Sequence, residues 1–382
     1  MQRVVVIGGG VVGASAAYQL ARAGVDTVLV DRGDAGHATA AGAGIISPGT
    51  STRPLPAFFP FAQAAVGWYP ALIGSLAEDG ETDTRYEAVG ELILARTGDE
   101  AAALPGLKAL FAERRAGGMP NLGNVIDVDA VTAREMFPAL GDVQAALHVP
   151  EAARVDGDCL RKALVAGARH HGATIRNGNV SLGVARDRVT GVVVDGEALD
   201  VDGVVIATGA WTNQVLAPLG VSVAVEPQRG QILHLTLGDT DTTRWPILGG
   251  TGSQYILTFG PNRVVSGATR ETGSGFDVRL TVGGLQSVFN HAMEVAPGLA
   301  GGTVSEIRIG LRPLSADGLP FLGKMPGHDN VVLATGHGPS GLQLGPYSGL
   351  VAARLVTGQA VDVDLTPFAV DRDVTDHEYA GH

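Results

Sequence analysis

A run of glycines near the start of the chain limits the possible folds more than any other feature. The segment VVVIGGGVVGASAAYQLARAG, residues 4–24, begins with a short apolar run that is typical of a buried parallel strand. Small and apolar residues then recur at helical spacing. Gly8, Gly10 and Gly13 fit the GxGxxG fingerprint: the first permits a tight turn, the second lets the backbone approach a pyrophosphate, and the third allows close packing of helix on strand. The segment therefore predicts a strand–turn–helix unit that binds the phosphates of a dinucleotide at the helix N-terminus.

An acidic residue at the end of the next strand narrows the choice of nucleotide. Residues 25–30 form that strand, and Asp31 follows it, where its carboxylate would accept hydrogen bonds from a ribose hydroxyl. The carboxylate would repel a 2′-phosphate, although the neighbouring Arg32 leaves that alternative open. The fingerprint itself does not separate NAD from FAD, because both contain ADP.

Two later glycine turns favour FAD. They lie in VVIATGAW (residues 204–211) and ATGHGPSGLQLGPYSG (residues 334–349). In the second segment, backbone N–H groups and a helix start could face the N1–C2=O edge of a flavin, which becomes anionic on reduction. A soluble NAD enzyme has no evident need for this second loop.

The pattern of strands and helices indicates two domains, as does the length of 382 residues. Signals of βαβ units return at residues 158–210 and 330–358, whereas the chain between residues 221 and 312 is mostly β-strand. We therefore predict an α/β fold, in which a discontinuous Rossmann-like FAD-binding domain of the two-dinucleotide-fold type lies beside a β-rich, antiparallel substrate-binding domain. The predicted boundaries place residues 1–85, 150–220 and 306–382 in the first domain and residues 86–149 and 221–305 in the second.

Composition argues against several classes of partner and site. The net charge of −12, with no run of Lys or Arg, argues against nucleic acid or an anionic membrane surface as a partner. The single cysteine, Cys159, excludes an internal disulfide framework and a cysteine-rich metal site. The ten histidines are scattered apart from the adjacent His170 and His171, and we expect no metal. No apolar stretch approaches the roughly 18 residues of a membrane span, and the first strand begins too early to leave room for a signal peptide. We expect a soluble, cytoplasmic protein, and a homo-oligomer is compatible with the sequence.

Several segments, in the same order along the chain, resemble the D-amino-acid oxidase superfamily of flavoproteins and, within it, the glycine oxidases. The resemblance runs nearly end to end and is carried by VVVIGGGVVGASAAYQLARAG, TAAGAGI, VIATGAW, YILTFGPNRVVSGAT, GLRPLSADGLPFLG and ATGHGPSGLQLGP. It implies an oxidoreductase with non-covalently bound FAD. Some relatives attach the flavin to a cysteine shortly after the position of Arg312, but the stretch LRPLSADGLPFLG contains no cysteine.

The resemblance also implies which residues bind FAD. The ADP half would lie against the fingerprint loop and Asp31, with the backbone of Val180 near the adenine, and the loop 337–343 would wrap the flavin ring. In full, the expected FAD-binding residues are Gly8, Gly10, Val11, Val12, Gly13, Asp31, Arg32, Ala38, Thr39, Ala43, Gly44, Ile45, Val180, His337, Gly338, Pro339, Ser340, Gly341, Leu342 and Gln343.

Two residues correspond by position to the group that holds the substrate carboxylate in this family. Arg312 in GLRP matches the arginine that pairs with the carboxylate, and Tyr255 in SQYILTF matches the tyrosine that hydrogen-bonds to it. A bidentate arginine–carboxylate contact would fix the orientation of the substrate and aim its Cα–H at flavin N5. The alternative interpretations are a structural ion pair for Arg312 and a strand core residue for Tyr255.

Two positions depart from the glycine oxidases. Pro339 stands where a glycine oxidase of the thiamine pathway typically has an arginine. Arg270, in SGATRETG, stands where glycine oxidases typically have an apolar residue that faces the side-chain pocket. An arginine there would suit a second anion, and we place Arg270 with Tyr255 and Arg312 among the expected catalytic-site residues. The alternative is that Arg270 turns outward and pairs with its neighbour Glu271, a contact worth little.

The sequence thus predicts an FAD-dependent amine oxidase. Its substrate would be glycine-like: an N-substituted glycine such as an N-carboxymethyl amino acid, with its second carboxylate on Arg270, or a D-amino acid. Hydride transfer to the flavin would give an imine that hydrolyses to a 2-oxo acid and an amine, and the electrons would pass to O₂ or to an electron carrier. A D-amino-acid dehydrogenase and a 2-hydroxy-acid oxidoreductase on the same scaffold stay open, since a carboxylate clamp serves each of them. An NAD-dependent dehydrogenase and a non-enzymatic nucleotide-binding protein are further alternatives.

Overall fold

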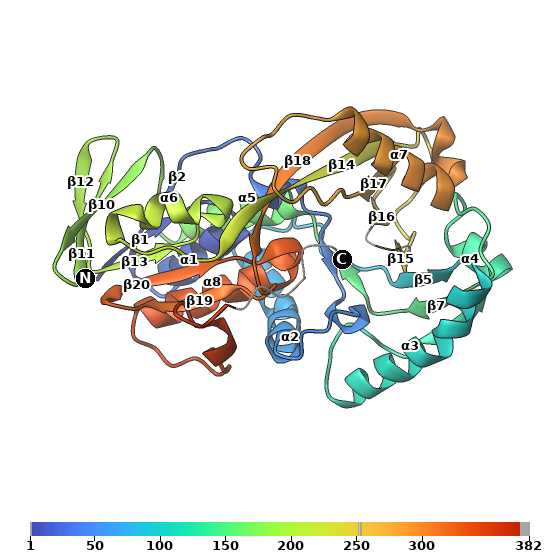
Figure 1. Cartoon of the computed structure of the whole chain (residues 1–382), viewed down its shortest axis with the longest axis horizontal. Helices are drawn as coiled ribbons and strands as arrows, with labels where there is room; N and C mark the ends of the chain where they lie inside the picture. Colours follow the sequence, from blue (N-terminus) through green and yellow to red (C-terminus); the bar gives the residue numbers. More distant parts are fainter. Residues whose placement is uncertain (1, 251, 253, 375–382) are drawn as a thin grey trace.

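The fold places two large sheets at opposite ends of the molecule. A computed structural model describes residues 2–250, 252 and 254–374 of the chain. In Figure 1 a mainly parallel sheet, which contains β1 (Arg3–Ile7), lies at one end, and a mainly antiparallel sheet lies at the other. This arrangement is the α/β fold with an antiparallel β-rich part that the sequence predicts.

The parallel sheet is buried on both faces. Its order is β19–β20–β13–β1–β2–β9, and its neighbours are parallel except that β19 pairs antiparallel with β20. Within β1, Val4 and Val6 pack into one apolar cluster and Val5 and Ile7 into another. Burial on both faces explains why β1 is apolar at every position after Arg3. The other strands are β2 (Asp26–Asp31), β9 (Thr174–Asn177), β13 (Gly203–Ile206), β19 (Phe321–Met325) and β20 (His328–Thr335).

Helices cover one face of this sheet, and a small antiparallel sheet covers the other (Figure 1). The helices on the first face are α1 (Val11–Arg22), α2 (Phe58–Glu78), α5 (Gly157–His170) and α8 (Gly341–Val356). The elements on the second face are β10 (Val180–Ala185), β11 (Arg188–Val194), β12 (Glu197–Asp200) and α6 (Thr212–Leu216). Asp195 and Gly196, both with positive φ, form the tight turn between β11 and β12.

The antiparallel sheet has its own apolar core. Its order is β18–β14–β17–β16–β15–β5–β7–β6, and its neighbours are antiparallel except for the parallel pair of β15 and β5. Leu92, Leu233 and Ile256, from three of its strands, are fully buried in this core. The strands are β5 (Glu91–Ala95), β6 (Ile126–Asp129), β7 (Ala145–Val149), β14 (Val225–Thr236), β15 (Ile247–Gly249), β16 (Tyr255–Phe259), β17 (Arg263–Gly267) and β18 (Thr303–Ser315), and the helices that pack on them are α3 (Gly98–Ala116), α4 (Ala130–Met136) and α7 (Val282–Val295).

Two long strands join the two ends of the molecule. β14 and β18 pair antiparallel from Val225 opposite Ser315 to Thr236 opposite Thr303, and Figure 1 shows them running from the centre to the far end. The 3-10 helix η1 (Ala38–Ala41), which follows β2, packs against β18. The C-terminal half of β18 therefore lies at the junction of the two parts.

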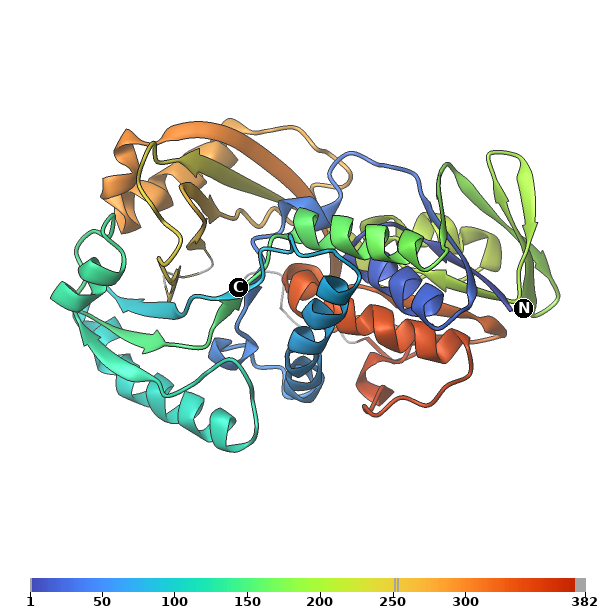
Figure 2. The same ribbon diagram turned by 180° about the vertical axis from the view of Figure 1, so that it is seen from behind.

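Short elements and α2 occupy the middle of the molecule in both views (Figures 1 and 2). They include the small sheet β3–β8–β4, built from β3 (Ile45–Ile46), β4 (Glu87–Ala88) and β8 (Ala153–Arg154). The further 3-10 helices are η2 (Pro48–Thr50), η3 (Gly209–Trp211), η4 (Ala217–Leu219), η5 (Pro297–Gly301), η6 (Gly338–Ser340) and η7 (Thr366–Phe368). Across the described ranges, no helix has the length and apolar character needed to cross a membrane.

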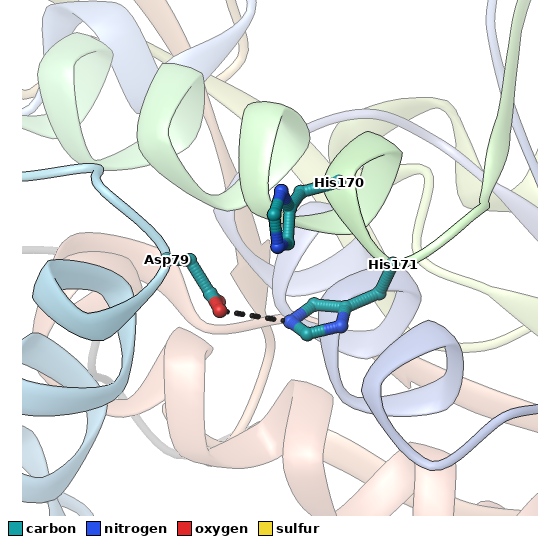
Figure 3. Close-up of side chains that lie close together, drawn as sticks. All are labelled: Asp79, His170 and His171. Atoms are coloured by element: carbon teal, nitrogen blue, oxygen red, sulfur yellow. Dashed lines mark hydrogen bonds and ion pairs between the residues drawn. The ribbon is translucent and has the colours of Figure 1, made fainter.

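The C-terminal ends of α2 and α5 meet at Asp79, His170 and His171 (Figure 3). His171 Nε2 lies 3.0 Å from Asp79 Oδ1, and the hydroxyl of Tyr18, on α1, donates to Asp79 Oδ2 at 2.6 Å. Burial alone would raise the pKa of Asp79, but the hydrogen bonds from Tyr18 and His171 lower it below its usual range. These bonds satisfy both carboxylate oxygens, and we interpret the cluster as a link between three helices.

Candidate active site

A cavity of about 380 Å³ lies where the carboxyl ends of β1, β2, β13 and β20 approach β16 and β18. In open α/β folds this edge of a parallel sheet is where nucleotides bind. The cavity wall combines segments that are far apart in the sequence: the fingerprint loop, residues 37–53, residues 207–215, residues 310–313 and the loop 334–343. The junction of the two large sheets is therefore the candidate active site.

Two of the fingerprint glycines, Gly8 and Gly13, occupy positions that no other residue could take without moving the backbone. Gly8 has φ +102°, and a Cβ there would lie 2.4 Å from the carbonyl oxygen of Ala207. A Cβ at Gly13 would lie 1.8 Å from the carbonyl oxygen of Gly8. Gly13 thus allows α1 to approach β1 closely, while Gly8 and Gly10 line the cavity.

Asp31 holds the fingerprint loop in place and also lines the cavity. Its Oδ2 accepts a hydrogen bond from the N–H of Gly9, and its Oδ1 accepts one from the N–H of Gly33 at 2.7 Å. Arg32 forms an ion pair with Asp34 at 2.7 Å, and both residues line the cavity. Two carboxylates at this point reinforce the argument against a 2′-phosphate.

The second glycine loop is packed tightly around the start of α8. His337 is almost fully buried, and its Nε2 lies 2.9 Å from Ser348 Oγ. Burial lowers the pKa of His337 to about 4, so this ring is neutral at physiological pH. The hydroxyl of Tyr69 donates to the carbonyl oxygen of Leu342, and Arg53 donates to Ser340 Oγ. These contacts fix the N-terminus of α8 against the cavity.

Three side chains from the antiparallel part meet at the other side of the cavity. Arg312 lies on β18, Tyr255 at the start of β16, and Arg270 just after β17. Arg312 Nη1 donates to the carbonyl oxygen of Thr269 at 2.9 Å. Gly230 leaves room for the Arg312 guanidinium, because a Cβ at Gly230 would lie 2.5 to 2.7 Å from three of its atoms.

The charges of these side chains prepare the site for an anion. Burial lowers the pKa of Arg312; the hydroxyl of Tyr255 opposes this effect and the nearby charge of Arg270 adds to it. Burial raises the pKa of Tyr255, so its hydroxyl stays protonated and can donate. Two guanidinium groups close enough to repel each other would both be stabilised by carboxylate ligands.

Nearly all of the residues expected from the sequence line the same cavity. Gly13 and Ser340 do not: Gly13 packs α1 on β1, and Ser340 is buried against Arg53. The expected residues that line it are Gly8, Gly10, Val11, Val12, Asp31, Arg32, Ala38, Thr39, Ala43, Gly44, Ile45, Val180, Tyr255, Arg270, Arg312, His337, Gly338, Pro339, Gly341, Leu342 and Gln343.

The cavity also has wall residues that the sequence did not single out. Trp211 lines it, and its position at the end of the predicted turn VIATGAW was a usable signal. Ser47 and Thr50 line it from the stretch after β3, where no motif marks them. Gly230 lines it opposite Gly310, a pairing set by the register of β14 and β18 that only the structure reveals.

The donor groups around the cavity fit a dinucleotide that carries a second ring system. α1 and α8 both begin at the cavity, so the N-terminal ends of two helices face it. The first would hold a pyrophosphate, and the second offers donors to a polar ring edge. This pair of helix starts is the arrangement that favours FAD over NAD.

Comparison with known proteins also indicates an FAD-binding protein. A model of the FAD-dependent oxidoreductase family DAO matches residues 3–355. An uncharacterized oxidoreductase of Bacillus subtilis, YurR, is 37% identical over 369 residues, covering 96% of this chain and 98% of its own. A glycine oxidase of Pseudomonas putida is 32% identical over 379 residues, with the same coverage of 96% and 98%.

A solved structure shares the whole architecture. The iminodiacetate oxidase of Chelativorans sp. BNC1 superposes with a TM-score of 0.92 at 38% identity, covering 96% of this chain and 99% of its own. At this coverage the similarity includes both large sheets.

Proposed function

Because this chain belongs to the DAO family of FAD-dependent oxidoreductases, its cofactor is FAD, and we propose that it oxidises a C–N bond of an N-substituted glycine with a second carboxylate. The observation that carries this proposal is the presence of Arg312, Tyr255 and Arg270 in one cavity wall. Arg312 and Tyr255 would hold the carboxylate of the glycine unit that is oxidised. Arg270 would hold the carboxylate at the far end of the substrate.

The iminodiacetate oxidase with the same architecture supports this assignment. Iminodiacetate is a secondary amine with a carboxymethyl group on each side of the nitrogen, so it offers one carboxylate to each arginine. An N-carboxymethyl amino acid has the same arrangement. A monocarboxylate such as glycine or sarcosine would leave Arg270 without a substrate partner.

Bound FAD supplies the two-electron acceptor for hydride transfer from the substrate Cα–H. The residues of this chain bind and orient the substrate: the bidentate contact of Arg312 fixes the carboxylate plane, and Tyr255 donates to the same group. Loss of the hydride and of the amine proton gives an imine, and addition of water releases glyoxylate and the amine. We propose O₂ as the final electron acceptor. Non-covalent binding of FAD is supported by Cys159, which lies on α5 outside the cavity wall.

The test is the anaerobic absorbance of the purified FAD-loaded protein during addition of single substrates. The substrates are iminodiacetate, sarcosine, glycine, D-alanine and 2-hydroxyglutarate. We expect iminodiacetate to bleach the flavin band at roughly 450 nm at the lowest concentration, and the band to recover when air is admitted. Bleaching by 2-hydroxyglutarate alone would show a hydroxy-acid oxidoreductase. Equal responses to iminodiacetate and sarcosine would remove the role proposed for the second carboxylate.

A further inference from the structure

The segment between β17 and α7, residues 268–281, carries Arg270 and reaches across the junction of the two parts. Phe276 packs on Trp211, a cavity wall residue, with ring centroids 5.6 Å apart. Val278 packs so closely on Gly36 that a Cβ at Gly36 would lie 2.5 Å from Val278 Cγ1. The conformation of this segment therefore determines the position of Arg270.

One buried arginine on β14 binds the segment at several points. Arg229 is 7% exposed, and its Nε and Nη2 donate to Glu271 Oε2 at 3.0 and 2.6 Å. Its Nη1 pairs with Asp277 Oδ2 at 2.8 Å. The backbones of Arg229 and Glu271 also exchange hydrogen bonds, at 2.9 and 3.2 Å. These contacts anchor the residue that directly follows Arg270.

The neighbouring glutamine anchors the residue that precedes Arg270. The backbone N–H of the fully buried Gln231 donates to Thr269 Oγ1 at 2.9 Å, and the N–H of Thr269 donates to the carbonyl oxygen of Gln231 at 3.2 Å. Gln231 Nε2 donates to Glu271 Oε1 at 2.7 Å and to Thr281 Oγ1 at 2.8 Å. Arg270 is thus held between two residues that are both bound to β14.

The two oxygens of the Glu271 carboxylate are engaged by these partners. Oε2 accepts from Arg229, and Oε1 accepts from Gln231 and from Thr269 Oγ1 at 2.6 Å. Glu271 forms a β-bridge with Arg229, and successive side chains of such an extended segment point in opposite directions. Glu271 therefore faces β14, while Arg270 lines the cavity. The Glu271 carboxylate, which the sequence left open as a partner of Arg270, forms an ion pair with Arg229 at 2.6 Å.

We infer that Arg229, Gln231 and Glu271, here called the clasp, position Arg270 and thereby set the preference for a second carboxylate. The inference rests on the proposed function. Arg229 is a positioning residue, and its contribution acts through Glu271. When Arg229 is removed, the Glu271 carboxylate loses its cation and becomes a competing partner for the neighbouring Arg270. Arg270 then binds the second carboxylate of the substrate more weakly, whereas Arg312 and Tyr255 still bind the first carboxylate.

The test compares kinetics of the FAD-loaded Arg229→Met variant with iminodiacetate and with sarcosine. We expect the KM for iminodiacetate to rise about tenfold or more, and the kcat and KM for sarcosine to stay within about twofold of wild type. The double variant Arg229→Met/Glu271→Gln removes the competing charge, and we expect it to recover part of the lost iminodiacetate affinity. A residue that merely stabilises the fold would not produce this recovery. If Arg229→Met fails to fold, Arg229→Lys with the same Glu271→Gln partner replaces it.

Arg372 offers a matched control outside the segment, and its partners lie on the turn that follows β18. It makes a bidentate ion pair with Asp317 at 2.7 and 2.9 Å and donates to the carbonyl oxygen of Leu319 at 2.8 Å, with a similar degree of burial. We expect Arg372→Met to leave the iminodiacetate-to-sarcosine ratio of kcat/KM unchanged. An equal change of that ratio in both variants, or no change in Arg229→Met, would contradict the positioning role proposed for the clasp.

Hydrogen exchange separates failure of the clasp from failure of the proposed function. In the FAD-loaded enzyme without substrate, Arg229→Met should speed amide exchange over residues 269–281, and Arg372→Met should not. If wild type shows no preference for iminodiacetate, the proposed function fails whatever the exchange shows. If wild type prefers iminodiacetate but residues 269–281 exchange at the wild-type rate in Arg229→Met, the clasp fails.

Discussion

Arg270 is the single residue on which the proposed substrate preference depends most directly. Replacement by Met keeps a long side chain in the cavity wall but removes the charge-assisted contact, which is worth about 1.5–3 kcal/mol. We therefore expect Arg270→Met to raise the KM for iminodiacetate ten- to hundredfold and to change the KM for glycine and sarcosine little. Steady-state oxygen consumption with the three substrates measures this. A similar rise for all three would mean that Arg270 acts on the fold of the site and not on the second carboxylate.

At the residue scale the sequence indicates the positions of the side chains around the cavity better than the contacts that support them. Arg312 and Tyr255 stand out by their resemblance to the family and Arg270 by its departure from it, and all three line the cavity. Gly230 and the contacts of Arg229 were not found, because both depend on which residues of β14, β18 and the 268–281 segment face one another. That register is a long-range property, and no local pattern in residues 226–233 (EPQRGQIL), which contain Arg229 and Gly230, specifies it.

The N-cap of helix α5 joins the helical layer on the parallel sheet to the antiparallel sheet. Asp156, its N-cap, accepts hydrogen bonds from the N–H groups of Asp158 and Cys159, each at 3.0 Å, and forms an ion pair with Arg263 of β17. Loss of such a cap typically costs about 1–2 kcal/mol. We expect Asp156→Ala to lower the urea midpoint of the FAD-loaded enzyme. Asp129→Ala removes the exposed cap of α4, which bonds Thr132, and should lower the midpoint less.

The pH dependence of this effect follows from the pKa of Asp156. Burial would raise that pKa, but the hydrogen bonds from Cys159 and Arg263 lower it below its usual range. The pKa of an aspartate in the unfolded chain is about 3.9. A carboxyl whose pKa is lower than this in the folded protein adds stability that is complete above the unfolded-state pKa. That stability is lost as the pH falls through the folded-state pKa. The difference between wild type and Asp156→Ala should hold from neutral pH to pH ~5 and shrink below pH ~4. A difference that vanishes near pH 6 to 7 would point to a histidine instead.

The elements that the sequence predicted well are those whose signals are local. The fingerprint strand and α1, the turn at Asp195 and Gly196, and the final strand–loop–helix each follow from residues within one short segment. The antiparallel part was predicted only as a class. Its order, with β5 parallel to β15 and β14 paired along its length with β18, depends on contacts between distant segments.

At the scale of the whole molecule, both parts build the cavity, so the cofactor and substrate proposed to fill it would contact both parts at once. The fingerprint loop and the start of α8 belong to the layers around the parallel sheet, whereas Tyr255, Arg270 and Arg312 belong to the antiparallel part. A ligand that fills the cavity therefore stabilises the junction as well as either part. A change in the stability of one part should therefore alter the stability of the other part through the bound ligand.

Removal of FAD should consequently destabilise a region that does not line the cavity. Trp245 lies 8% exposed in the core of the antiparallel part. In a variant in which Trp68 and Trp211 are replaced by Phe, it is the one remaining tryptophan, so its fluorescence follows the unfolding of that part. FAD at a hundred times its dissociation constant adds about 2.7 kcal/mol of stability, roughly 3 °C in the thermal midpoint of a chain of 382 residues. We expect the Trp245 midpoint to fall by this amount when FAD is removed and to return when FAD is added back, with ADP restoring only a part because it lacks the flavin. A Trp245 midpoint that is the same with and without FAD would show that the two parts unfold independently and that the cofactor is held by the parallel-sheet part alone.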